Sequence, residues 1–154
     1  MKDSSAGVWV YIGAAIFLVA LVVSAILVPE LRLLHFFQAL IYVAVIVLAR
    51  RNSAWGFGAG FTIAIVWNGF GFFVTHLIQA GAVAFWLLLR TGRVGQFVPM
   101  MVTLGAVGYF ILIVASGWAV LSQKTENRKW WKFVGGGAIA VAYFALIVSF
   151  ARPH

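Results

Sequence analysis

Long apolar runs alternate with short polar gaps along this chain of 154 residues, and every charged residue lies in a gap. About 20 apolar helical residues cross the hydrocarbon core of a bilayer, so long uncharged runs are typical of membrane-spanning helices. The pattern predicts an all-α fold, a polytopic integral membrane helical bundle of about five transmembrane helices with short loops. Residues 1–154 then form a single transmembrane domain. The uncharged runs are Ser4–Pro29, Leu33–Ala49, Asn52–Leu89, Val94–Gln123 and Phe133–Ala151.

Helix-start and turn signals set the expected boundaries of these helices. Pro29 suits a first helical position, and the acidic Glu30 that follows it is favoured in a first turn. The polar turn at residues 50–53 is short, so the second and third helices should be antiparallel neighbours. The expected spans are residues 7–28, 29–50, 54–76, 96–121 and 132–151.

The third run is too long for one straight span, because a helix over its whole length would reach about 57 Å. Its segment WNGFG at residues 67–71 contains two glycines and an asparagine, which favour a kink or a break. Two arrangements stay open. Either one bent helix continues to residue 89, or a span ends near His76 and a second piece lies near the interface. Whether residues 52–89 cross once or twice is also open, with a single crossing favoured.

The distribution of Lys and Arg predicts the orientation, because cytoplasmic loops carry an excess of both residues. With five spans, one side carries Lys2, Arg50, Arg51, Lys124, Arg128, Lys129 and Lys132. The other side carries only Arg32, Arg90, Arg93 and Arg152. We therefore expect a protein of the bacterial inner membrane, with its N-terminus in the cytoplasm and its C-terminus outside.

Composition narrows the function classes. Charged residues make up 9% of the chain, against about 25% in soluble domains, so little sequence is left for a soluble part. The net charge of +8 is spread over loop ends, where it orients helices and contacts anionic lipid rather than nucleic acid. The absence of cysteine excludes disulfides, thiolate metal sites and a cysteine nucleophile.

Polar side chains within the runs are the candidate site. The second helix places His35, Gln38 and Tyr42 on one face, since they are three and seven residues apart. In an antiparallel pair that turns near residue 52, His35 lies opposite Asn68, and Glu30 lies opposite His76. The third run places Asn68, Thr75 and Gln79 on one face. His76 lies beside this face, and Trp67 lies in the middle of the run.

Three interpretations of these polar residues stay open. They can join neighbouring helices by hydrogen bonds, or they can form a ligand or ion site, since polar groups in a membrane are costly. As a third interpretation, His35 and His76 can be the axial ligands of a b-type haem, which makes them candidate metal ligands. The ligand or ion site would contain Glu30, His35, Gln38, His76 and Gln79.

We expect a non-enzymatic subunit of a membrane assembly that binds lipid or another apolar ligand between its helices. The stripe Gly56, Gly60, Ala64 and Asn68 allows close helix packing, within the chain or between copies of a homo-oligomer. The expected partners are therefore the lipid bilayer and other membrane subunits or further copies. The alternatives are a small transporter or channel along the polar faces of helices two and three, a haem electron-transfer subunit, and an enzyme acting on lipid or quinone through the outer polar residues.

Overall fold

The computed structural model describes residues 5–93, 97–123 and 129–150, and these ranges fold entirely into helices and short connections. The prediction of an all-α helical bundle is confirmed. Five helical segments are long and apolar enough to cross a membrane, and a sixth apolar helix is shorter. The elements are α1 (Ser5–Leu27), the 3-10 helix η1 (Pro29–Leu31), α2 (Arg32–Arg50), α3 (Ala54–Gly69), the π-helix η2 (Phe70–Val74), α4 (Leu77–Thr91), α5 (Phe97–Leu121) and α6 (Trp130–Phe150).

The predicted boundaries are close to the observed ones. The proline signal at Pro29 does start a helical turn, but that turn is the separate 3-10 segment η1, and α2 begins at Arg32. The last helix begins at Trp130, two residues earlier than predicted. Residues 96 and 151, where two predicted spans start or end, lie outside the described part of the chain.

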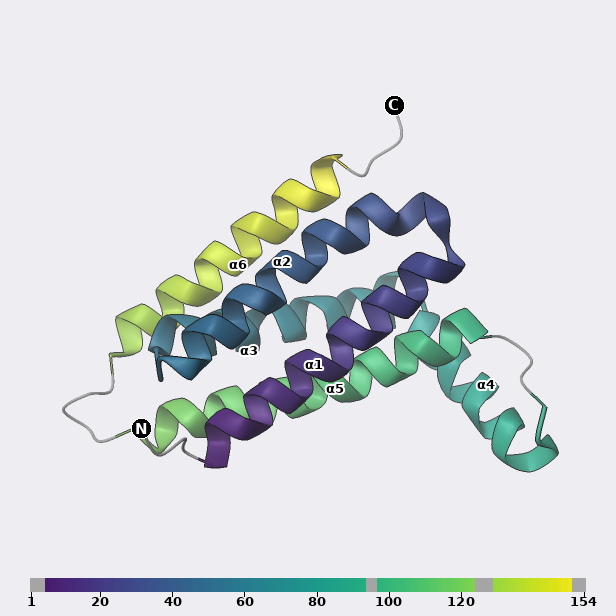
Figure 1. Cartoon of the computed structure of the whole chain (residues 1–154), viewed down its shortest axis with the longest axis horizontal. Helices are drawn as coiled ribbons and strands as arrows, with labels where there is room; N and C mark the ends of the chain where they lie inside the picture. Colours follow the sequence, from purple (N-terminus) through teal and green to yellow (C-terminus); the bar gives the residue numbers. More distant parts are fainter. Residues whose placement is uncertain (1–4, 94–96, 124–128, 151–154) are drawn as a thin grey trace.

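Glycines bring pairs of helices into backbone contact. α1 crosses α5 where a Cβ built on Gly13 would lie 2.8 Å from the carbonyl oxygen of Gly108. α3 packs on α6 in the same way, because a Cβ on Gly136 would overlap the carbonyl group of Trp55. Small residues that let backbones approach closely are the usual basis of helix association in lipid. Figure 1 shows the resulting bundle, with α1, α2, α5 and α6 running roughly along one direction.

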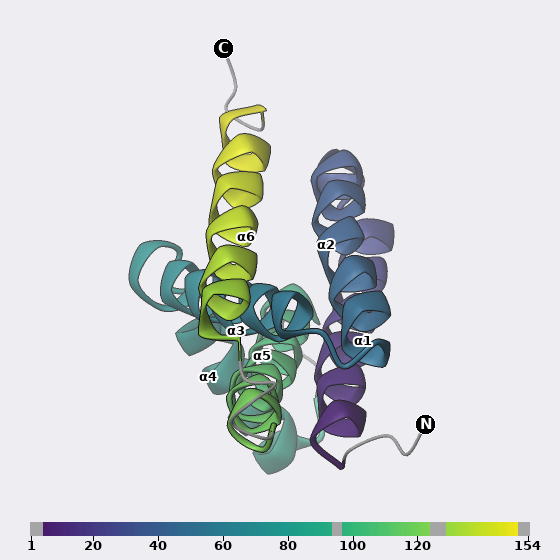
Figure 2. The same cartoon turned by 90° about the vertical axis from the view of Figure 1, so that its left-hand side faces the viewer.

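The second and third helices are antiparallel neighbours, as predicted. The chain reverses at Asn52, which adopts a left-handed conformation that asparagine tolerates better than most residues. Beyond the turn, a Cβ on Gly60 would lie 3.1 Å from the side chain of Val45 and 3.2 Å from that of Ser116 on α5. This part of the small-residue stripe therefore packs within the chain. Figure 2 shows α2 and α3 taking different directions away from the turn.

The third apolar run divides into two helices. α3 ends at Gly69, η2 follows, and His76 takes a left-handed conformation with φ of 53° before α4 begins. The Gln79 side chain donates a 2.7 Å hydrogen bond across this break to the carbonyl oxygen of Phe72. The run is therefore not one continuous helix, and α4 is a separate second piece; its place near the interface stays a prediction. α4 has 15 residues, about 22 Å of helix, which is shorter than a membrane span.

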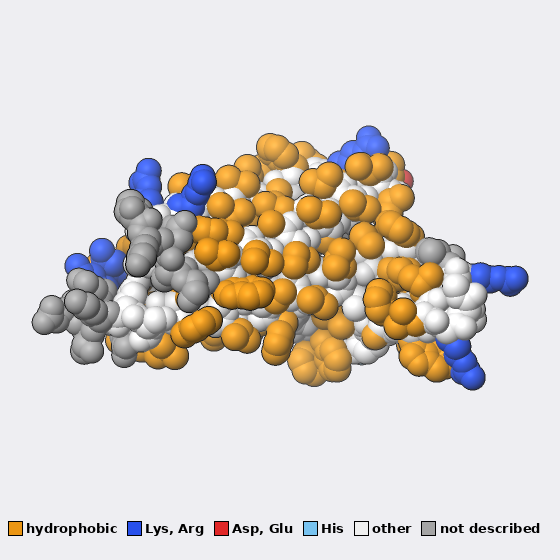
Figure 3. Space-filling model, turned by 60° about the horizontal axis from the view of Figure 1, so that its bottom comes forward, with side chains coloured by type: hydrophobic (Ala, Val, Ile, Leu, Met, Phe, Trp, Pro, Cys, Tyr) orange, Lys and Arg blue, Asp and Glu red, His pale blue; other side chains and the backbone are white. Residues whose placement is uncertain are grey.

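The surface has the distribution of side chains that a membrane protein needs. Hydrophobic side chains cover the middle of the face seen in Figure 3, and Lys and Arg side chains gather toward its two ends. Together with the five long apolar helices, this surface fits a small polytopic membrane protein. Four basic residues of the orientation count lie outside the described residues: Lys2, Lys124, Arg128 and Arg152.

Candidate functional site

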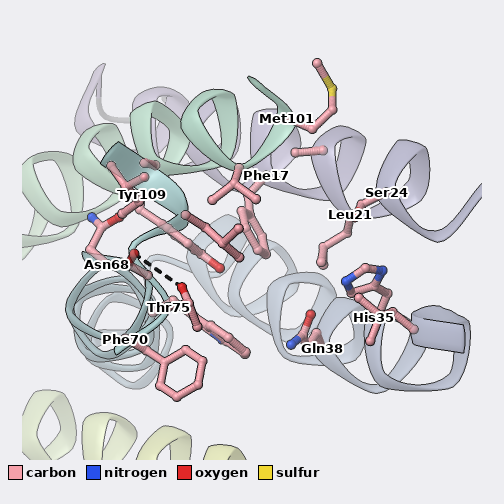
Figure 4. A pocket seen from close by; sticks show the side chains of 18 of the residues that line it. Phe17, Leu21, Ser24, His35, Gln38, Asn68, Phe70, Thr75, Met101 and Tyr109 are labelled. Carbon is pink, nitrogen blue, oxygen red and sulfur yellow. Dashed lines mark hydrogen bonds between the residues drawn. The ribbon is translucent and has the colours of Figure 1, made fainter. Parts of the chain in front are cut away.

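A cavity of about 390 Å³ lies where α2 and α3 have separated, and side chains from most of the other helices also line it (Figure 4). Its volume is within the range of small-molecule sites, about 300–1,000 Å³. Its walls are mainly apolar, with a few polar groups among them. Five of the predicted site residues line this cavity: His35, Gln38, Trp67, Asn68 and Thr75.

The α2 side of the cavity carries two polar side chains one helical turn apart. Gln38 is only 4% exposed, and its amide points into the cavity in Figure 4. None of the side-chain hydrogen bonds found among the described residues involves this amide. His35 is half-buried, and its Nδ1 atom is buried without a hydrogen-bond partner in the described part of the chain. The Nδ1 atom of His35 has therefore lost water without a replacement, whereas the Gln38 amide still borders the cavity.

The α3 side contributes Asn68, Trp67 and, after the π-helix, Thr75. The Asn68 Oδ1 atom is buried and accepts no hydrogen bond from any described residue. Thr75 uses its hydroxyl locally, donating a 3.3 Å bond to the carbonyl oxygen of Gly71 (Figure 4). Trp67 packs edge-on against Phe144 of α6 at 4.8 Å between ring centres, so its indole forms an apolar part of the wall.

An aromatic cluster closes the cavity toward the α2–α3 turn. Phe17 and Tyr109 line the cavity and stack with their ring centres 4.0 Å apart. Tyr42 lies behind them, fully buried, and donates a 3.0 Å hydrogen bond to the Tyr109 hydroxyl. Tyr42 could be predicted from the sequence, but Phe17 and its apolar neighbours on α1 and α5 could not, because they carry no polar signal. Ser24 on α1 and Tyr109 on α5 are exceptions, since each places a hydroxyl within an apolar run.

Four predicted site residues do not line the cavity. Glu30 is exposed in η1, Tyr42 lies behind the lining, and His76 is exposed at the break before α4. The Gln79 amide nitrogen bonds to Phe72 and lies 3.5 Å from the His76 Nδ1 atom. The predicted shared face of Asn68, Thr75 and Gln79 assumed an unbroken helix. The π-helix and the left-handed residue interrupt that face, so these three residues do not form one row.

The chemistry that this arrangement offers is binding by shape with a few hydrogen bonds. Only one of the two candidate haem ligands, His35, reaches the cavity. Within residues 5–93, 97–123 and 129–150, no group of three or more His, Asp or Glu side chains is placed to hold a metal ion. The cavity as described can hold a molecule with an apolar body and one small polar end.

Comparison with known proteins adds no further constraint. No known protein family matches the sequence, and no curated protein or solved structure matches the chain. The cavity and the helices around it are therefore the features of this chain that bear on its function.

Proposed function

We propose that this protein is a non-enzymatic subunit of a membrane assembly that binds a lipid or another apolar ligand between its helices. The observation that carries the proposal is the mainly apolar cavity between the helices, which the side chains of Gln38, His35 and Asn68 help to line without a hydrogen bond to any described residue. Had these residues served only to join helices, their polar atoms would bond to one another or to backbone across α2 and α3. Buried polar groups without partners are rare in proteins and call for an explanation.

The alternatives have less support. A transport pathway along α2 and α3 would meet the buried Tyr42, Tyr109 and Phe17 cluster, beyond which Gly60 packs directly on Val45. Bis-histidine haem ligation needs two imidazoles at one site, whereas the cavity is lined by one. An enzyme that uses Glu30 would act at the exposed η1 turn, outside the cavity.

We propose the inner membrane of a bacterium as the location, with the N-terminus in the cytoplasm and the C-terminus outside. Arg51 follows α2, and Lys132 lies in the first turn of α6, which starts beside the beginning of α3. Both basic residues therefore lie at the same end of the bundle, as a five-span arrangement requires. Because the chain has no cysteine, the variants Arg51→Cys and Arg93→Cys can be labelled singly in cells with an impermeant maleimide. Labelling from outside should reach only the second.

Native mass spectrometry after purification from the original membrane tests the central proposal. We expect the chain to carry a lipid-like molecule or further subunits, and Gln38→Leu to reduce the amount of bound ligand. A preparation that is monomeric and carries neither a ligand nor a partner would contradict the proposal. A maleimide that labels Arg51→Cys from outside would overturn the proposed orientation and leave ligand binding untouched.

A further inference from the structure

The short helix α4 differs from the spanning helices in direction and in length. In Figure 1, α1, α2, α5 and α6 run roughly along one direction, and α4 runs across that direction at one end of the bundle. Its 15 residues make about 22 Å of helix, less than the hydrocarbon thickness of about 30 Å. A helix of this length that lies across the spanning helices fits the plane of the membrane surface.

One face of α4 packs on the first turns of α5. A Cβ built on Gly81 would overlap the carbonyl group of Pro99 and the hydroxyl of Thr103. The Thr103 hydroxyl also lies 3.4 Å from the carbonyl oxygen of Ile78, within hydrogen-bond distance. Ala84, one turn after Gly81, is buried on the same face. These contacts hold α4 beside the beginning of α5.

The opposite face of α4 carries a tryptophan and an arginine. Trp86 and Arg90 are four residues apart and lie on the side of the helix away from Gly81 and Ala84. The guanidinium group of Arg90 lies over the Trp86 ring, 4.9 Å from the ring centre. Tryptophan is enriched where a membrane meets water, and arginine extends its charge beyond an apolar stem. Both side chains therefore suit the level of the lipid head groups.

Exposed apolar side chains lie on both sides of this face. Val83 and Leu87 are exposed on one side, and Phe85 and Leu89 are exposed on the other. Interfacial helices combine such residues with basic and aromatic ones, since their apolar side chains reach the acyl chains while their charges stay among the head groups. The exposed surface of α4 has this composition.

The C-terminal end of α4 is positively charged. Arg90 lies in the last turn, and Arg93 follows Gly92, whose left-handed conformation ends the helix. The chain contains three acidic residues, of which the structure describes only Glu30. Neither arginine forms an ion pair with a described residue. Two guanidinium groups without carboxylate partners are complementary to phosphate, to which arginine donates parallel hydrogen bonds.

We propose that α4 lies in the plane of the membrane surface and that Arg90 and Arg93 bind the phosphate groups of anionic lipids. The N–H groups of a guanidinium point outward in its own plane, so stacking on Trp86 leaves Arg90 able to donate to phosphate. A lipid fits this surface better than a free phosphate ion, because exposed apolar side chains surround the arginines. Neither arginine lines the cavity, so this inference is independent of the ligand proposed there.

Depth measurements test the position of α4. Because the chain has no cysteine, Ala82→Cys and Leu89→Cys can each carry one spin label in vesicles of phosphatidylcholine and phosphatidylglycerol. Both positions are exposed on one side of the helix, about 10 Å apart along its axis. Collision rates with oxygen and with a water-soluble nickel complex should give the two labels the same depth.

Two positions on α1 calibrate the depth measurement. Val19→Cys and Ile26→Cys have the same spacing on an exposed face of a spanning helix. Their labels should differ in depth by about 8–10 Å. A difference of that size between Ala82→Cys and Leu89→Cys would show that α4 enters the bilayer, and it would overturn the proposed position.

A fluorescent label on Leu89→Cys tests the choice of lipid. Its quenching by nitroxide-labelled phosphatidylglycerol is compared with its quenching by phosphatidylcholine that carries the same nitroxide chain. We expect a preference of at least about threefold for phosphatidylglycerol, because each arginine near an anionic surface contributes about fivefold in affinity. Substitution of both arginines, Arg90→Gln with Arg93→Gln, should reduce the preference to about 1.5-fold or less.

The matched control removes the same net charge at the other end of the bundle. Arg50→Gln with Arg51→Gln lies at the α2–α3 turn, so it should keep the wild-type preference beside Leu89. The preference is a ratio for one labelled site, and a loss of folded protein lowers both of its terms alike. A preference that survives loss of Arg90 and Arg93, or that falls equally in the control, overturns lipid binding by these arginines.

Inorganic phosphate distinguishes a lipid head group from a soluble ion. Phosphate added at constant ionic strength should leave the preference for phosphatidylglycerol unchanged, because the ion gains nothing from the apolar side chains of α4. If phosphate abolishes the preference, the two arginines form a site for a free anion, and the assignment to lipid is overturned.

Discussion

Replacing Gln38 with leucine tests whether this side chain joins neighbouring helices or is free to bind a ligand. Gln38 is 4% exposed and its amide faces the cavity. In the unfolded chain, within micelle or membrane, the same amide reaches water or other polar groups. In the folded chain no described residue bonds to this amide, which borders the cavity, so Gln38→Leu should not destabilise the ligand-free protein.

The expected size follows from the burial and the missing partner. A buried polar group left unsatisfied costs about 1–3 kcal/mol. Leucine is close to glutamine in size and adds apolar surface to a wall that is already apolar, so little strain should oppose the gain. Because the Gln38 amide still borders the cavity, we expect the gain for Gln38→Leu to lie below that range, between about 0 and 1 kcal/mol.

Gln79→Leu is the control, because it makes the same chemical change where the amide nitrogen has a backbone partner, while the Oε1 atom is buried without one. Gln79 donates a 2.7 Å bond to the Phe72 carbonyl oxygen across the break between η2 and α4. Loss of a hydrogen bond of this kind costs about 0.5–1.5 kcal/mol. Gln79→Leu also removes the buried, unpartnered Oε1 atom, so we expect it to lower the free energy of unfolding by less than about 1 kcal/mol and Gln38→Leu to be the more stable variant.

Reversible unfolding in mixed micelles, with increasing amounts of a denaturing detergent, gives both free energies when helix content is followed by circular dichroism. The protein must first be freed of co-purified lipid, because a ligand that satisfies Gln38 would hide the gain. The reasoning is refuted if Gln38→Leu lowers stability as much as Gln79→Leu does. Such a result would show that Gln38 joins helices and has a structural role.

Two further predictions concern packing. Gly136→Ala should lower the free energy of unfolding by about 1–3 kcal/mol, because its Cβ would overlap the backbone of α3, which cannot move aside. Gly69→Ala is its control in the same assay, because no atom lies within 4 Å of a Cβ at that position. We expect this variant to be neutral or to gain up to about 1 kcal/mol of stability. Equal losses of stability in both variants would count against the α3–α6 contact. Tyr42→Phe and Tyr109→Phe should each cost about 0.6–1.7 kcal/mol, and a double-mutant cycle with no coupling energy would disprove the hydrogen bond between their hydroxyl groups.

The candidate site could be predicted from the sequence only on the helices that carry polar signals. His35 and Gln38 were found because polar residues in an apolar run are conspicuous, and Asn68 because the antiparallel turn placed it opposite them. Phe17 and Met101, which close the cavity from α1 and α5, are ordinary apolar residues in ordinary spans. Their contribution depends on which helices pack together, and no local pattern contains that information.

The break after α3 shows the same limit in another form. The sequence indicated a kink near Gly69, since two glycines and an asparagine follow Trp67. The conformation of His76 could not be read in advance, because a left-handed histidine is uncommon and is held by its surroundings. The break separates Gln79 from Asn68. Asn68 and Thr75 of the predicted row line the cavity, whereas Gln79 bonds to the Phe72 carbonyl oxygen.

The number of long apolar helices, their approximate limits and the antiparallel pairing of α2 with α3 could be predicted from the sequence. These features follow from local properties: the length of uncharged runs, the positions of charges and the shortness of one turn. The packing of α1 on α5 and of α3 on α6, and the separation of α2 from α3 that leaves a cavity, are known only from the folded chain. Those outcomes depend on close contacts between distant glycines, such as Gly13 with Gly108, and a contact between two helices is a property of both surfaces together.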